Sequence, residues 1–204
     1  RVEETDVPTG YEVSQELIDG VVVLTNTHAP EVKDIPVNKV WDDADNQDGL
    51  RPDSVTVNLL ADGEVVDTVE LSEANKWQHN FADLPVYSKG QAITYTVTEN
   101  TVENYSTEIN GGTVTNRYTP EETSVTVTKD WQDGNNQDGN RPDSIEVQLT
   151  ANGEATDYTA ILNDDNQWTA TWSGLALNAN GEAIDYSVVE LSPEGYDVTI
   201  DDAD

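Results

Sequence analysis

Three residue types that can react with one another recur along this chain, namely a lysine, a glutamate and an asparagine. The lysines stand in the similar segments VNKVW and VTKDW, and glutamates end the similar segments YTVTE and YSVVE. The asparagines stand in LTNT and VTNR. In chain order the recurring residues are Glu4, Asn26, Lys39, Glu99, Asn116, Lys129 and Glu190.

This set could form an amide bond between two side chains. Burial disfavours a charged ammonium, and the neutral amine that remains can attack a carbonyl carbon. A buried glutamate that stays protonated can donate a hydrogen bond to the asparagine carbonyl and polarise it. Holding amine and amide in contact supplies the effective molarity that a poor electrophile needs, and ammonia leaves.

Each of these residues also has an ordinary structural interpretation. A single strand lysine in an acidic protein is usually an edge residue whose charged end reaches solvent. An asparagine near the end of a strand is usually a turn former. Because all three types recur together in matching segments, we favour the reactive interpretation, with Lys39 and Asn116 as the bonded pair of the complete set.

The elements that must position these residues belong to a repeat of about 90 residues. Residues 37–64 (VNKVWDDADNQDGLRPDSVTVNLLADGE) recur as residues 127–154 (VTKDWQDGNNQDGNRPDSIEVQLTANGE), 90 positions later. We therefore expect residues 1–30 to be the last strands of a preceding unit and 31–120 to be a complete unit. Residues 121–204 should be a unit without its final strand.

Within a unit the apolar residues alternate with a period of two, as in VTVNLL and IEVQLT, which predicts strands. Asp-Gly at 62–63 and Asn-Gly at 152–153 predict two-residue hairpin turns, because these pairs accept positive φ values. Short strands at intervals of about ten residues predict an all-β fold of tandem antiparallel β-sandwiches, immunoglobulin-like or prealbumin-like.

At these lysine, glutamate and asparagine segments, and at the NQDG-x-RPDS segment after each first strand, the chain resembles the Cna B-type domains of Gram-positive surface adhesins and pilins. The resemblance implies a self-formed Lys–Asn isopeptide bond with the glutamate as promoter. Carried over to this sequence, it implies a bond between Lys39 and Asn116, with Glu99 as the catalytic residue. It also implies an extracellular, cell-wall-anchored parent protein.

The other copies of the set are split between the two ends of the sequence. Residues 1–30 contain Glu4 and Asn26, and residues 121–204 contain Lys129 and Glu190. An isolated apolar strand should be disordered unless it is paired. We therefore expect residues 1–30 of one molecule to supply the last strand to residues 121–204 of the next, where Asn26 could react with Lys129. The alternative is that residues 1–30 pack on the complete unit.

Composition excludes several other functions. Acidic residues outnumber basic ones 41 to 9, and the formal charge of −32 disfavours nucleic acid and anionic membranes as partners. Cysteine is absent, so disulfides and thiolate metal sites are excluded. The acidic loops at 42–49 and 132–139 do not have the spacing of a calcium loop. We expect no metal or cofactor, and we expect carboxylates such as Asp42 and Asp43 to be solvated.

We therefore expect a structural protein whose only chemistry is one self-crosslinking event, and not a turnover enzyme. Its role would be a stalk or spacer of a surface adhesin, with neighbouring repeats or copies of itself as partners. The alternative is a module that contacts a host matrix protein through its own β-surface. That alternative predicts an exposed apolar patch that differs between the units.

Overall fold

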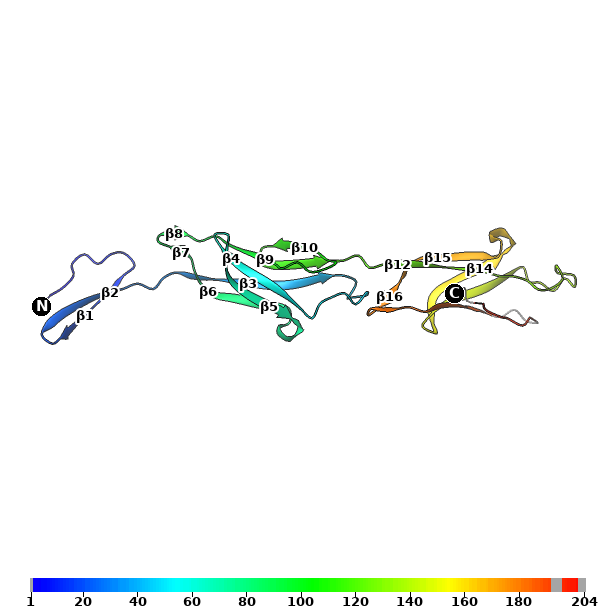
Figure 1. Ribbon diagram of the computed structural model, residues 1–204, viewed down its shortest axis with the longest axis horizontal. Coiled ribbons are helices and arrows are strands. Elements are labelled where there is room, and N and C mark those ends of the chain that lie inside the picture. Colours follow the sequence, from blue (N-terminus) through cyan, green and yellow to red (C-terminus); the bar gives the residue numbers. More distant parts are fainter. Residues whose placement is uncertain (1, 192–195, 202–204) are drawn as a thin grey trace. The chain divides into compact units, whose positions relative to one another are not determined.

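The computed structural model describes residues 2–191 and 196–201. Figure 1 shows the strands that these residues contain. The prediction of an all-β fold is confirmed, because the helices among these residues are two single 3₁₀ turns, η1 (Glu73–Asn75) and η2 (Asp164–Asn166). None of the described helices has the length and apolarity needed to cross a membrane. The strands are β1 (Glu12–Ile18), β2 (Val21–Thr27), β3 (Val32–Asp42), β4 (Ser54–Ala61), β5 (Glu64–Ser72), β6 (Gln78–Pro85), β7 (Tyr87–Ser88), β8 (Gln91–Ala92), β9 (Tyr95–Glu99), β10 (Ser106–Asn110), β11 (Thr113–Arg117), β12 (Glu122–Thr128), β13 (Ser144–Ala151), β14 (Glu154–Asn163), β15 (Thr169–Ala176), β16 (Asn178–Ala179), β17 (Glu182–Ala183) and β18 (Tyr186–Glu190).

The chain divides into two compact units. The first contains Arg1–Val40, Asp53–Glu103 and Thr107–Asn116. The second contains Trp41–Pro52, Asn104–Ser106 and Arg117–Asp204, so the loop that follows β3 belongs to it.

The first unit is built on a four-stranded sheet, ordered β10-β11-β3-β6, and a three-stranded sheet, ordered β5-β4-β9. Alternate residues of β4 are buried, as the period of two predicts. Both sheets contribute side chains to the core, which are aliphatic except for one phenylalanine. These core residues include Val37, Val55, Val57, Leu59, Leu71, Phe81, Val97 and Val114.

The first and last strands of this sandwich lie side by side with the same direction. The Asn38 N–H donates to Gly112 O, and the Tyr118 N–H donates to Asp42 O. Both bonds fit one parallel register, in which Asn38 lies opposite Thr113 and Asp42 lies opposite Arg117. The predicted antiparallel sandwich therefore also contains one parallel pair, in which the strands that begin and end the repeat are neighbours.

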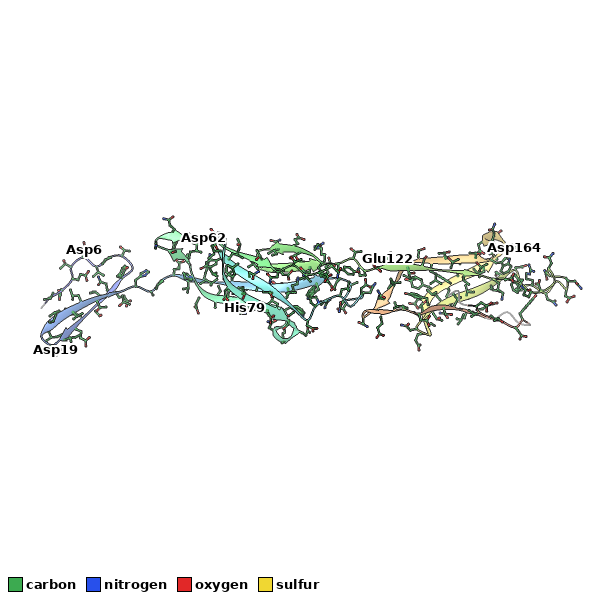
Figure 2. The ribbon with its side chains drawn as sticks, viewed as in Figure 1. Asp6, Asp19, Asp62, His79, Glu122 and Asp164 are labelled. Carbon is green, nitrogen blue, oxygen red and sulfur yellow. The ribbon has the colours of Figure 1, made fainter. Side chains whose placement is uncertain are left out.

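The second unit repeats most of this plan with a three-stranded sheet, β14-β13-β18, and two pairs, β12-β15 and β16-β17. Its core cluster contains Ile145, Val147, Leu162 and Trp168. Both predicted hairpin turns are confirmed. Asp62, labelled in Figure 2, and Gly63 have φ values of 52° and 92°, and Asn152 and Gly153 have 51° and 79°.

Residues near the beginning of the chain form a separate hairpin of β1 and β2. The two strands pair in register from Glu12 opposite Thr27 to Ile18 opposite Val21. Asp19 stands in the turn between them (Figure 2) with a φ of 49°. Every residue of both strands is exposed. The sequence led us to expect that this segment pairs with another molecule, and in the structure each of its strands pairs with the other.

Candidate functional site

The first lysine of the recurring set points into the core of the first unit. Lys39 lies on β3 two positions after the buried Val37, so the alternation of the strand places both side chains on the inner face. Only 7% of Lys39 is exposed. A buried ammonium is rare unless it is paired, so this position requires a partner.

The partner of Lys39 is the predicted glutamate, which comes from the facing sheet. Glu99 ends β9, which pairs with β4 so that Glu99 lies opposite Val57. Lys39 Nζ lies 3.1 Å from Glu99 Oε1, and both side chains are fully buried. Thr107 on β10 donates its hydroxyl to the other carboxylate oxygen, Glu99 Oε2, at 3.0 Å. Both oxygens of this buried carboxylate are therefore engaged.

The predicted asparagine lies on the strand beside the lysine. Asn116 is on β11, which neighbours β3 in the four-stranded sheet, and it is fully buried. In the register given above, Lys39 lies opposite Val114 and Asn116 is the next inward-facing residue of β11. Among the described residues, neither Oδ1 nor Nδ2 of Asn116 has a hydrogen-bond partner. A buried amide without partners is costly, and native proteins keep such groups mainly where they have a use.

The second unit contains the same lysine–glutamate pair. Lys129 Nζ lies 2.8 Å from Glu190 Oε2, with side-chain exposures of 15% and 6%. Glu190 lies opposite Val147 on β13, as Glu99 lies opposite Val57 on β4. The sequence placed Lys129 within the first strand, but β12 ends one residue earlier, at Thr128. The Lys129 N–H still donates to Trp168 O at 2.8 Å.

The hairpin brings together the other two members of the set. Asn26 Nδ2 donates to Glu4 Oε1 at 3.0 Å, on the exposed surface of the hairpin. Its counterparts Glu99 and Glu190 end strands, but Glu4 lies in the irregular segment before β1. The recurring glutamate thus contacts lysine in two copies of the set and asparagine in the third, which are the two contacts that a promoter of Lys–Asn bonding requires.

One buried carboxylate was missed by the sequence analysis. Asp43 was expected to be solvated together with Asp42, but it is only 2% exposed. It accepts two hydrogen bonds from the guanidinium of Arg51, at 3.1 and 2.7 Å, and one from the hydroxyl of Tyr105 at 2.9 Å. Its neighbour Asp42 is indeed exposed. The sequence signal was the pattern D-x-x-N-x₄-R, which occurs in both repeats.

The second repeat has the same hydrogen bonds in its loop. Asp133 accepts two hydrogen bonds from Arg141, at 2.9 and 2.7 Å. The Asn136 N–H donates to Asp133, and Asn136 Oδ1 accepts from the Arg141 N–H. These loops, which resemble calcium loops in composition, therefore each use one aspartate, Asp43 or Asp133, to hold an arginine.

The aspartate–arginine pairs make stability depend on pH in the acid range. Hydrogen bonds from Arg141 and from the Asn136 N–H lower the pKa of Asp133 from 3.8 to about 2. A carboxyl whose pKa is lower in the folded state stabilises the fold above its ordinary pKa and loses this effect as the pH falls. We expect the contribution of Asp133 to disappear between about pH 4 and about pH 2.

Urea unfolding of the wild type, Asp133→Asn and Asp157→Asn at several pH values in this window would measure the effect. Asp157 is an exposed aspartate of β14 and serves as the matched control. Asp133→Asn should reduce the pH dependence of the free energy of unfolding more than Asp157→Asn does. Equal curves for the two variants would contradict the prediction.

Comparisons with known proteins agree with this geometry. A family model described as Cna protein B-type domain matches residues 35–117 and 125–204. A Staphylococcus aureus protein named collagen adhesin is 51% identical over 205 aligned positions, and the match covers 100% of this chain and 17% of the relative. The chain therefore spans about a sixth of the length of that relative.

Two solved structures of S. aureus B repeat units are also similar. The crystal structure of two B repeat units (B1B2) of the collagen binding protein is 50% identical, with a TM-score of 0.54, and the match covers 98% of this chain and 54% of that one. A single unit (B1) of the collagen binding surface protein is 53% identical, with a TM-score of 0.43, and covers 84% of this chain and 92% of that one. The chain belongs to the family of Cna protein B-type domains.

Proposed function

We propose that the chain is a piece of the stalk of a bacterial surface adhesin, and that its complete unit closes a Lys39–Asn116 isopeptide bond without any enzyme. The observation that carries this proposal is the fully buried Lys39–Glu99 pair at 3.1 Å, in which Lys39 lies on the inner face of β3, the strand next to that of Asn116. The amide of Asn116 has no hydrogen-bond partner among the described residues. Bond formation would turn these costly buried groups into a covalent link.

The reaction balances without any further reagent. A proton passes from the Lys39 ammonium to the Glu99 carboxylate, which leaves a neutral amine and a neutral carboxyl and removes two buried charges. The amine attacks Cγ of Asn116 while the Glu99 carboxyl donates its proton toward the amide. Nδ2 takes up this one proton and leaves as ammonia, and Glu99 takes one proton back from the attacking nitrogen. One C–N bond forms and one breaks, and Glu99 remains available as an acid or base.

The position of the bond suits a protein that carries load. Lys39 is on the first strand of the complete unit and Asn116 is on the last, and these strands are neighbours in one sheet. A pull on the two ends of the unit would pass through the bond between the strands. The residues between positions 39 and 116 would then bear little of the force.

Single-molecule pulling of this chain tests the stalk function. In Asn116→Ala, unfolding of the complete unit should release the 77 positions from 39 to 116, or about 250 Å of extended chain. The wild type should lack this extension. The second unit has no asparagine after Glu190, so its unfolding should be seen in both proteins and provides an internal control. If the wild type and Asn116→Ala show the same number of unfolding extensions, then the bond does not protect the complete unit from force.

We propose an extracellular, cell-surface location for the parent protein. The relatives of this chain are named collagen adhesin and collagen binding surface protein. The high acidity, with a formal charge of −32, keeps neighbouring copies apart and suits a crowded surface. Any contact with a host matrix protein would then be made through the parent adhesin.

We further propose that the hairpin of one molecule can complete the second unit of another. In the described part of the chain, β12 pairs with β15 alone, whereas its counterpart β3 has strands on both sides. The hairpin strand β2 has Asn26 where β11 has Asn116, and it is exposed at every position. Docking of β2 beside β12 would bring Asn26 toward the Lys129–Glu190 pair.

A denaturing gel of concentrated protein tests this second proposal. Covalent head-to-tail chains should appear as a ladder of multimers that is lost in both Asn26→Ala and Lys129→Met. Asn110→Ala, which changes an exposed asparagine of β10, is the control and should keep the ladder. A single monomer band for the wild type would rule out the covalent form of the proposal.

A direct matrix-binding module is the second candidate function. The observation that favours it is that exposed apolar residues differ between the units, with Val65 and Val66 on β5 and Tyr158 and Ile161 on β14. Solid-phase binding of the chain to fibrillar collagen separates the two candidates. Binding that is lost in Val66→Thr or Ile161→Thr would favour the second one.

A further inference from the structure

A tryptophan follows each lysine of the set by two positions, and an arginine lies over its ring. In the second unit, Lys129 Nζ lies 4.8 Å from the ring centroid of Trp131, and Arg141 Cζ lies 5.5 Å from it. The rings of Trp168 and Tyr196 meet Trp131 edge-on, at 5.1 and 5.0 Å. One indole is therefore in contact with two cations and two aromatic rings.

The first repeat shares the arginine and the tyrosine of this arrangement. Arg51 Cζ lies 5.4 Å from the ring centroid of Trp41, and Tyr105 meets this ring edge-on at 5.1 Å. Trp41 stands on β3 two residues after Lys39, so the alternation of the strand places both side chains on the same face. An arginine over the ring and a tyrosine at its edge therefore recur in both repeats.

The arginine over each tryptophan is held by hydrogen bonds to residues of its own loop. Asp43 binds the guanidinium of Arg51 through both carboxylate oxygens, and Asn46 Oδ1 accepts from the Arg51 N–H. The Asn46 N–H in turn donates to Asp43. A bidentate pair fixes the plane of the guanidinium, and the guanidinium stacked on the indole fixes the ring.

We propose that Trp41 and Trp131, each held by its aspartate–arginine pair, are positioning residues for the crosslinking lysine. This inference rests on the proposed function. The lysine side chain has four flexible carbons, and the amine must be held close to the asparagine carbon for the bond to form. In the second unit Lys129 Nζ contacts both the Glu190 carboxylate and the Trp131 ring. The carboxylate takes the proton of the amine, and the ring restricts where the amine can lie and shields it from water.

The experiment follows bond formation over time in the complete unit. The full chain is synthesised in a cell-free system, samples are quenched in denaturant at intervals, and intact mass gives the fraction that has lost ammonia. Trp41→Leu should slow the reaction about tenfold or more, because a misplacement of about 1 Å can cost about a hundredfold in rate. Trp41→Phe retains an aromatic face and should restore most of the rate.

Two controls separate positioning from general stability. Lys33→Met removes another cation–π contact of β3, in which Lys33 Nζ lies 4.8 Å from the Tyr95 ring centroid, and it should leave the rate unchanged. The thermal stability of each tryptophan variant is measured in the Asn116→Ala background, which cannot form the bond. If Trp41→Leu does not fold, a double variant, Asp43→Asn with Arg51→Gln, takes its place. This neutral pair should also slow the reaction.

The outcomes distinguish this inference from the proposed function. If the wild type loses no ammonia, the proposed function fails and this inference fails with it. If the wild type reacts and Trp41→Leu, or the neutral pair in its place, reacts equally fast, only the positioning role is overturned. It is also overturned if Trp41→Leu and Trp41→Phe slow the reaction in proportion to the thermal stability that each loses. Slow reaction of Trp41→Leu with rescue by Trp41→Phe at similar stability supports it.

Discussion

We expect Asn116→Ala to lower the free energy of unfolding of the complete unit by about 4–5 kcal/mol, because the proposed bond to Lys39 would close the unfolded chain into a loop of 77 positions. For a domain of this size the melting temperature should fall by roughly 20 °C or more. This is the largest effect that we expect from a single substitution in the chain. Calorimetry of the wild type and the variant would measure it, with intact mass as a check on the bond.

A double-mutant cycle separates the bond from the loss of buried atoms. Lys39→Met and Asn116→Ala each remove the bond, so the double variant removes it only once. The double variant should therefore be destabilised by about 4–5 kcal/mol less than the sum of the single variants. If the two effects are additive, the bond does not contribute to stability.

Asp43→Ala should destabilise the fold by about 3 kcal/mol, because it leaves Arg51, whose side chain is 22% exposed, without its buried carboxylate. Asp43 accepts hydrogen bonds from Arg51, Tyr105 and the Asn46 N–H, and its side chain is only 1% exposed. Burial alone would raise the pKa of Asp43, but the hydrogen bonds from Arg51, Asn46 and Tyr105 outweigh it and lower the pKa. The ionised carboxylate is therefore part of the folded structure.

The neighbouring aspartate is a matched control. Asp42 lies 3.7 Å from Arg117, but both side chains are more than half exposed. Asp42→Ala should change stability by no more than about 1 kcal/mol, as is usual for surface ion pairs. Urea unfolding of both variants gives the comparison. If Asp42→Ala lowers the free energy of unfolding as much as Asp43→Ala does, then the burial of Asp43 does not determine how much it contributes to stability.

The recurring set was predictable from the sequence because it repeats. Lys39 and Glu99 are 60 positions apart, and no local pattern joins them, but the same pair recurs as Lys129 and Glu190. The Asp-Gly and Asn-Gly turns were predictable because their φ preference is local. Thr107, which donates to Glu99, was not predictable, because its contact depends on how β10 lies against β9 and no second copy supports it.

The aspartates of the loops show why the remaining features were missed. In a chain with 41 acidic residues, Asp42 and Asp43 look alike, and only the fold turns one toward Arg51 and the other toward solvent. The contact between Asn26 and Glu4 was missed for a related reason. The hairpin pairs with itself and brings residues 22 positions apart together, whereas the repeat suggested a role for each in another molecule.

The intact mass of the purified, denatured chain tests the central claim most directly. A self-formed Lys39–Asn116 bond predicts a monomer that is lighter than the sequence by one ammonia. Asn116→Ala and Lys39→Met should each have the full calculated mass of their own sequences. A wild-type monomer with its full calculated mass would contradict the account, because the buried lysine, glutamate and asparagine would then form no bond.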